Sequence, residues 1–311
     1  MSVYDLSLPP IDSDLLDRLE RGLDPARPER SEVPFTVIGY GEISTVFRID
    51  GGGEVAYKRM PLFRDEEEAE RYVGSFVEYS AHLADAGILV PPQQTAIVSV
   101  PDRPVVLYIA QPLLPAEHFC HIRMQDAGAD EARRVVATVT REVAKIWSWN
   151  GKNAPARELS LDGQLSNWVL SAEGGRPYYI DTSTPLYRID GVEQLDPELF
   201  LKSAPALLRW VLRLFFVKEV LTRYYDLRMV LRDLAANLYK EGRDDLVSAA
   251  IDEINALFNG SPLTVKDTEH YYAEDKTIWR VYLAFRRLDR FFASRILRRR
   301  YHFLLPNKID R

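Results

Sequence analysis

Cysteine is almost absent from this sequence, and long uninterrupted runs of apolar residues are absent altogether. Cys120 is the single cysteine among 311 residues, so no intramolecular disulfide can form and a reducing, cytoplasmic compartment is expected. The most apolar stretch, 210–220, contains three charged side chains and is far shorter than the roughly 20 apolar residues that a membrane helix needs. The sequence therefore predicts a cytoplasmic protein without a membrane span.

An excess of positive charge is also lacking. The formal net charge is −6, which gives no general attraction to nucleic acid. The arginine-rich run 286–300 is interpreted as a solvated helix face rather than a phosphate-binding or membrane patch. The first residues are acidic and are interrupted by Pro9 and Pro10, which is not the pattern of a signal peptide.

The composition that remains is that of a folded protein. Hydrophobic residues make up 46% of the chain and charged residues 28%, with 16 Tyr and 13 Phe, which excludes a disordered chain. The length suggests roughly two domains or lobes. Residues 1–34 are predicted to be an N-terminal leader, with a short helix at 15–23 that Asp12 or Ser13 caps.

Residues 35–112 are predicted to form a five-stranded antiparallel sheet with one helix. Asp50-Gly51 is a strong hairpin signal, and the glutamates that open the helix suit the positive end of its dipole. Prolines after Gln111 end the sheet. The expected strands are Phe35–Ile38, Thr45–Ile49, Glu54–Met60, Ile97–Val100 and Val105–Ala110, and the expected helix is Asp65–Ala86.

Residues 113–311 are predicted to be mainly helical, with one β-hairpin inserted. Apolar residues at three- and four-residue spacing indicate amphipathic helices. The expected helices are 131–149, 197–258 and 275–300, and the expected hairpin strands are Trp168–Leu170 and Pro177–Ile180.

The hairpin carries the most informative polar residues. Asp162 lies five residues before Asn167, and Asp181 ends the second strand. Phosphoryl transfer needs a carboxylate that takes the proton of the accepting hydroxyl, and oxygen ligands that hold Mg²⁺. A hairpin brings its entrance and exit together, so Asn167 and Asp181 are expected to face one metal. The alternative is that Asp162 and Asn167 are turn or cap residues.

The sheet supplies candidate phosphate-binding groups. Gly39, Gly41 and Ser44 lie between the first two strands, where glycine lets backbone N–H groups approach phosphate oxygens. Lys58 closes the run Val55-Ala56-Tyr57-Lys58, which matches the V-A-x-K pattern of a phosphate-contacting lysine. The alternatives are a hairpin glycine pair and an exposed strand lysine.

The order of these elements resembles that of the protein-kinase-like superfamily, in its small-molecule branch of aminoglycoside phosphotransferases and choline kinases. The motifs that resemble it cover about residues 35–181, and residues 182–311 match in being helical. The resemblance implies a two-lobed α+β fold, with an N-lobe at 35–112 and a helical C-lobe at 113–311. It also implies ATP and Mg²⁺ as cofactors. The residue roles that it implies are Lys58 on the phosphates, Glu78 paired with Lys58, Asp162 as catalytic base, Asn167 and Asp181 on magnesium, and Gly39, Gly41 and Ser44 over the phosphates. The adenine hinge is implied near Ala110 to Leu113, with Gln111 and Leu113 as cofactor-binding residues.

Two departures from the family pattern bear on activity. Ser160 stands where the branch usually has histidine, and Thr182-Ser183 follows the metal-binding aspartate in place of an aromatic or glycine-containing pair.

A second motif, 232–237, mimics a tyrosine-kinase catalytic loop, but its Asp–Asn spacing is four and it lies in a helical pattern. We interpret Asp233 and Asn237 as neighbours one helical turn apart.

The function expected from these residues is an ATP- and Mg²⁺-dependent phosphotransferase that acts on a hydroxyl of a small molecule. The small-molecule preference rests on the resemblance and on the lack of an A-P-E element after Asp181. The alternatives are a nucleotide-binding module that acts through protein partners, and a nucleotidyl transferase. The acceptor pocket is expected from the helices after 195, and neither the acceptor nor the choice between ATP and GTP follows from the sequence.

Overall fold

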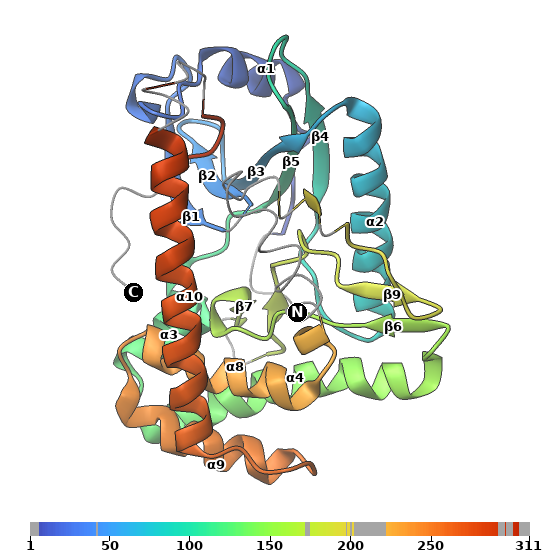
Figure 1. The fold of residues 1–311 in the computed structure, drawn as a ribbon, viewed down its shortest axis with the longest axis vertical. Coiled ribbons are helices and arrows are strands. Elements are labelled where there is room, and N and C mark those ends of the chain that lie inside the picture. The colour runs from blue at the N-terminus through green and yellow to red at the C-terminus, as the bar shows by residue number, and fades with distance from the viewer. Residues whose placement is uncertain are drawn as a thin grey trace.

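The computed structural model describes residues 6–41, 43–171, 175–196, 198, 199, 201, 222–291, 296 and 301–304. Within these residues it is a mixed α and β protein. A five-stranded antiparallel sheet lies at one end with helices α1 (Ser13–Gly22) and α2 (Glu66–Asp85) (Figure 1). Helices α3 (Cys120–Asp126), α4 (Ala129–Asn153), α8 (Leu227–Lys240) and α9 (Val247–Leu257) lie at the other end. The predictions for 202–221 and for most of 292–300 fall outside the described residues.

The five-stranded sheet has the order β1-β2-β3-β5-β4, and all its described pairings are antiparallel. This confirms the sheet predicted from the sequence. The first, third and fifth strands end two or three residues later than expected, and the fourth begins three residues and ends two residues earlier than expected. They are β1 (Phe35–Tyr40), β2 (Thr45–Ile49), β3 (Val55–Phe63), β4 (Gln94–Val98) and β5 (Val105–Pro112).

The two faces of this sheet are covered differently, because alternate residues of a strand point to opposite faces. Helix α1 (Ser13–Gly22) packs Leu16 and Leu19 against one face, which Phe47, Tyr57 and Tyr108 line. The segment predicted to be a leader is thus part of a second hydrophobic core. Asp12 caps the helix by accepting the N–H of Leu15 at 2.9 Å.

The other face of the sheet packs on α2 (Glu66–Asp85), which was expected at Asp65–Ala86. The side chain of Asp65 caps it by accepting the N–H of Glu68, and Gly87 follows its end with φ of 82°. Positive φ is the conformation that favours glycine after a helix. The cap and the glycine explain why this helix was predictable to within a residue.

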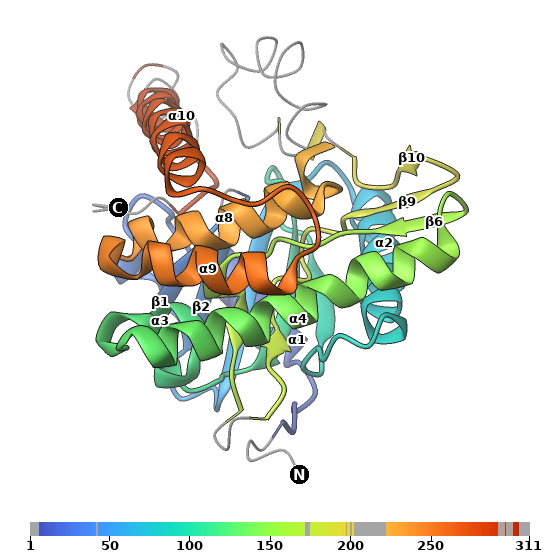
Figure 2. The ribbon, with the colours of Figure 1, turned by 90° about the horizontal axis from the view of Figure 1, so that it is seen from below.

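The helical part begins after β5. Helices α4, α8 and α9 lie side by side (Figure 2), and α10 packs against α8. Helix α10 begins ten residues before the predicted 275, since Thr264 accepts the N–H of Asp267 and opens it there. The helices are α3 (Cys120–Asp126), α4 (Ala129–Asn153), α8 (Leu227–Lys240), α9 (Val247–Leu257) and α10 (Val265–Phe291).

Two small sheets interrupt these helices. The predicted hairpin is β7 (Trp168–Val169) with β8 (Tyr178–Tyr179), paired in register Trp168↔Tyr179. A three-stranded sheet that the sequence did not predict joins β6 (Arg157–Leu159), β9 (Tyr187–Ile189) and β10 (Val192–Glu193).

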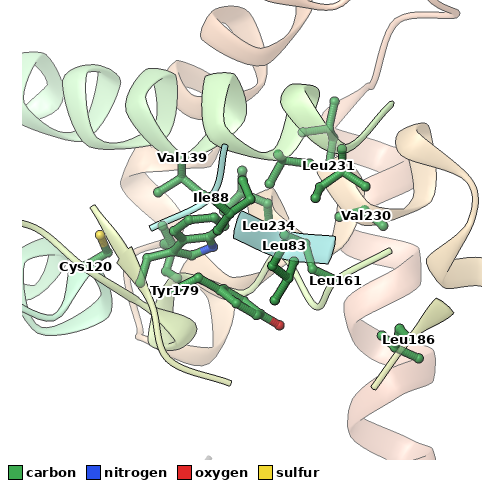
Figure 3. Close-up of a cluster of buried hydrophobic side chains, with 14 of the residues drawn as sticks. Leu83, Ile88, Cys120, Val139, Leu161, Tyr179, Leu186, Val230, Leu231 and Leu234 are labelled. Carbon is green, nitrogen blue, oxygen red and sulfur yellow. The ribbon is translucent and has the colours of Figure 1, made fainter. Parts of the chain in front are cut away.

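One hydrophobic core joins α2 to the helical part. Leu83 and Ile88 at the end of α2 lie in the same cluster as Val139 of α4, Leu161 before the Asp162 loop, and Leu234 of α8 (Figure 3). Because packed cores resist deformation, this cluster fixes the loop at 162–167 relative to α2 and the sheet.

Candidate active site

Lys58 of β3 and Asp181, which follows β8, form an ion pair across 123 residues of sequence. Nζ of Lys58 lies 2.7 Å from Oδ1 of Asp181 and 2.7 Å from Oγ of Ser183. Lys58 retains 19% of its side-chain exposure and Asp181 24%, so both groups remain open to solvent at this point. The structure thus brings two of the predicted site residues together.

Asn167 and Asp181 lie at the two ends of the β7–β8 hairpin, as predicted. The N–H of Ile180 donates to the carbonyl of Asn167 at 3.0 Å, which fixes the two ends of the hairpin against each other. The side chain of Gln111 donates to the carbonyl of Ile180 at 3.2 Å. The end of β5 is therefore bonded to the residue directly before Asp181.

Asp162 lies in the loop that enters this hairpin. Its Oδ1 accepts the N–H of Gln164 at 3.1 Å, and its carbonyl accepts Nδ2 of Asn167 at 3.3 Å. Its N–H donates to the hydroxyl of Tyr179 at 3.2 Å. Gly163 lets the loop approach α8, because a Cβ at that position would lie 2.8 Å from Cγ1 of Val230. The loop is therefore held by its own hydrogen bonds, by Tyr179 and by its close packing on α8.

The pKa values of Asp162 and Asp181 are shifted in opposite directions. Burial, with the charges of Asp233 and Asp181, raises the pKa of Asp162 well above its ordinary value. Burial would also raise the pKa of Asp181, but the charge of Lys58 and hydrogen bonds from Lys58 and Ser183 lower it overall. Neighbouring carboxyl groups whose pKa values are pushed apart are typical of sites with distinct acid and base roles.

Glu78 does not pair with Lys58, contrary to the sequence prediction. Its Oε2 accepts the hydroxyl of Tyr187 at 2.9 Å, and its Oε1 lies 3.6 Å from Nε2 of His82. Glu78 therefore faces β9 and its own helix. The place expected for a glutamate beside Lys58 is taken by Ser183, which the sequence prediction missed.

The glycine loop forms a tight turn between β1 and β2. The N–H of Gly41 donates to the carbonyl of Ser44 at 3.0 Å, and a Cβ on Gly41 would lie 2.8 Å from Oγ of Ser44. Gly39 pairs with Val46 at an irregularity of the β1–β2 register. Glycine is thus needed at 41 for a close approach of the turn to Ser44.

The predicted adenine hinge is built differently from expectation at one residue. The N–H of Leu113 donates to the carbonyl of Glu54 at 2.8 Å, so it is not available to a base edge in this structure. Gln111 uses its side chain on Ile180. These two residues join β5 to its neighbours at the place where a hinge was predicted.

A family model described as a family of unknown function (DUF6206) matches residues 18–290. The chain belongs to this family. Comparison with curated proteins found no significant match. The matched range runs from within α1 to within one residue of the end of α10, so it includes every residue of the site described above.

Other residues of this DUF6206 member support the site and were missed in the sequence. Tyr72 and Tyr79 of α2 donate their hydroxyls to the carbonyls of Ser183 and Ser160, the latter at 2.8 Å. Buried Asn237 of α8 accepts the N–H of Leu165 at 3.1 Å. The two tyrosines occupy an inward stripe that any buried helix has, so they gave no separate signal. Asn237 was visible in the rejected 232–237 motif.

The donor groups at the DUF6206 site fit magnesium better than a softer metal. Asn167 uses its Nδ2 on the carbonyl of Asp162, which leaves its amide oxygen as the atom that could bind a metal. Mg²⁺ is usually bound through one or two carboxylates, with substrate phosphates and waters as the other ligands. Among the residues that the structure describes, no group of three or more His, Cys, Asp and Glu side chains is placed to hold a metal.

None of the described helices combines the length and the apolar character that crossing a bilayer requires. The apolar stretch 210–220 lies outside the described residues.

Proposed function

We propose that this chain is an ATP- and magnesium-dependent phosphotransferase with a kinase-like, two-lobed arrangement, and that it acts on a hydroxyl of a small molecule. The observation that carries the proposal is the 2.7 Å contact between Lys58 and Asp181. Lys58 belongs to the predicted phosphate-binding residues of the sheet, and Asp181 belongs to the predicted metal-binding residues of the hairpin. The contact brings the two groups of residues together at a point that is partly exposed to solvent.

The roles follow from the chemistry of the side chains. Lys58 would bind phosphate oxygens as a point charge. Asp162 would take the proton of the acceptor hydroxyl, and its raised pKa makes its ionised form a stronger base than an exposed carboxylate. Asn167 and Asp181 would hold magnesium, which supplies positive charge that neutralises charge on the phosphates.

The chain after Asp181 supports a small acceptor rather than a protein. Strand β9 begins at Tyr187 and pairs at once with β6. Five residues separate Asp181 from that strand, and no A-P-E element of the kind that closes a protein-kinase activation segment follows Asp181 in the sequence.

Ser160, in place of the usual histidine, raises the alternative of a nucleotide-binding module without turnover. Its carbonyl accepts the hydroxyl of Tyr79, and its Oγ donates to the carbonyl of Tyr224. These bonds anchor the backbone of the loop that the histidine would otherwise hold, which favours the enzyme over the binding module.

The test is to measure MgATP binding and slow ATP hydrolysis by the wild type and by Asp162→Asn. We expect the variant to bind MgATP with unchanged affinity and to lose hydrolysis. Binding without turnover in the wild type, with any of a library of hydroxyl acceptors, would instead support the binding module. AMP attached to the product would identify a nucleotidyl transferase, and absence of MgATP binding would refute the proposal.

A further inference from the structure

Arg232 of α8 is a cation without an anionic partner among the described residues. Its guanidinium lies over the ring of Tyr271 of α10, with Cζ 4.5 Å from the ring centre. Its Nε is buried and makes no hydrogen bond. A buried donor left without an acceptor costs free energy, so this guanidinium is suited to an acceptor that comes from outside the chain.

The charges that act on Arg232 include two further guanidinium groups. Burial, together with the charges of Arg228 and Arg223, lowers the pKa of Arg232, while Asp267 acts in the opposite direction. Asp267 is already paired with Arg228, Nη2 to Oδ2 at 3.1 Å. The carboxylate of Asp267 is therefore in use by Arg228, and no ion pair joins it to Arg232 among the described residues.

The position of Arg232 relative to the reacting groups is set by Tyr271. The hydroxyl of Tyr271 is hydrogen-bonded to the side chain of Asp233, and it also feels the charge of Asp162. Helices α8 and α10, which carry these residues, are in contact. Tyr271 therefore contacts Arg232 through its ring and Asp233 through its hydroxyl. The charge of Asp233 in turn acts on Asp162, the proposed catalytic base.

We infer that Arg232 binds an oxyanion, a carboxylate or a phosphate, of the acceptor molecule. The acceptor is then a small compound that carries both a hydroxyl for phosphorylation and an anionic group. A guanidinium presents two parallel N–H donors to such an oxyanion, and the ring of Tyr271 supports its flat face. This inference rests on the proposed function, because it assigns the substrate class of the same site.

A structural role for Arg232 makes a different prediction. If its stacking on Tyr271 only stabilises the contact between α8 and α10, its replacement lowers stability and affects all ligands alike. If it binds the acceptor, its replacement affects anionic compounds selectively. The matched control is Arg280→Gln on α10, since Arg280 is an exposed arginine that lies outside the site.

The experiment measures thermal shifts and phosphorylation rates, in the presence of a non-hydrolysable ATP analogue or of MgATP respectively. The probes are inorganic phosphate, glycerate and glycerol 3-phosphate, with neutral glycerol and cationic ethanolamine as comparisons. We expect the wild type and Arg280→Gln to be stabilised by the anionic probes. Arg232→Gln should lose about tenfold or more of that apparent affinity, and Arg232→Lys should recover part of it.

Two outcomes overturn the inference while leaving the proposed function intact. One is MgATP binding together with equal responses of the wild type and Arg232→Gln to every anionic probe. The other is phosphorylation of neutral or cationic acceptors in preference to anionic ones. A failure of the proposed function looks different, because the wild type would then show no response to MgATP at all.

Discussion

The hydroxyl of Ser183 is hydrogen-bonded to Nζ of Lys58 at 2.7 Å and to Oδ1 of Asp181 at 3.0 Å. The carbonyl of Ser183 is in turn held by the hydroxyl of buried Tyr72. Helix α2 therefore orients the ion pair through a tyrosine and a serine. In the family that the sequence resembles, a helix glutamate was expected to do this.

Ser183→Ala is predicted to weaken MgATP binding by about tenfold or more, which corresponds to the loss of one hydrogen bond to a charged group. Glu78→Gln should change it by less than twofold, because Glu78 faces Tyr187. Titration of both variants with a fluorescent ATP analogue checks this. A larger effect of Glu78→Gln would show that the glutamate turns to Lys58 when nucleotide binds.

Asn237→Ala is predicted to reduce turnover as well as stability. Asn237 bonds the N–H of Leu165 and the side chain of Gln164, so its loss leaves a buried N–H in the loop 162–167 unsatisfied, at a cost of about 1–3 kcal/mol. Asn255 makes an equivalent pair of bonds to the backbone of Leu263, at 2.8 and 2.9 Å. Asn255→Ala should lower stability by a similar amount and leave turnover unchanged. Urea unfolding measures the loss of stability in each variant, and steady-state rates measure the loss of turnover.

Asp162→Asn is predicted to stabilise the protein at neutral pH. Because the pKa of Asp162 is raised in the folded state, the unfolded chain loses this proton first, and stability falls as pH rises between the unfolded and folded pKa values. The variant avoids that loss and keeps the Oδ1 acceptor for Gln164. Its melting temperature should exceed that of the wild type at pH 7, and the difference should shrink toward pH 4. Equal differences at both pH values would contradict this.

Glu20→Gln is predicted to destabilise the protein by roughly 3–5 kcal/mol, since it breaks a buried ion pair. Glu20 of α1 binds Arg59 through two contacts, at 2.5 and 2.9 Å, and accepts the hydroxyl of Tyr108. Burial opposes ionisation, but Arg59 lowers the pKa of Glu20 below its ordinary 4.5. The stabilisation is therefore present above pH 4.5 and is lost as pH falls through the lower folded pKa.

The measurement for Glu20→Gln is denaturant unfolding from pH 3 to pH 7. Asp17→Asn is the control, because Asp17 pairs with Arg21 on the exposed side of the same helix. The control should behave like the wild type. If Glu20→Gln were as stable as Asp17→Asn, α1 would not be anchored to the sheet through Arg59.

The sequence predicted those parts of the fold that local patterns determine. Helix α2 has an acidic first turn and is followed by Gly87. The strands of the five-stranded sheet are separated by recognisable turn residues, such as Asp50-Gly51. The sheet of β6, β9 and β10 was missed because these strands are two or three residues long and half of their residues are charged. Such strands have no periodicity that a sequence pattern can detect.

The site was predictable where residue type and spacing carry the chemistry. Lys58, Asn167 and Asp181 were placed by motif, and the contact between Lys58 and Asp181 agrees with that placement. The partner of Lys58 was not predictable, because several glutamates share α2 and nothing in the sequence indicates that Glu78 meets Tyr187. Hydrogen bonds between residues 111 positions apart, such as that of Tyr72 to Ser183, depend on the completed fold.

Strand β3 serves two purposes through neighbouring residues, since Lys58 faces Asp181 while Arg59, on the opposite face, binds Glu20 and the carbonyl of His302. A slip of this strand by one position would exchange these faces. The lysine would then be enclosed beneath α1, and the guanidinium would face Asp181. The contacts of Arg59 with Glu20 and with the backbone of His302 therefore favour the one alignment of β3 in which Lys58 meets Asp181.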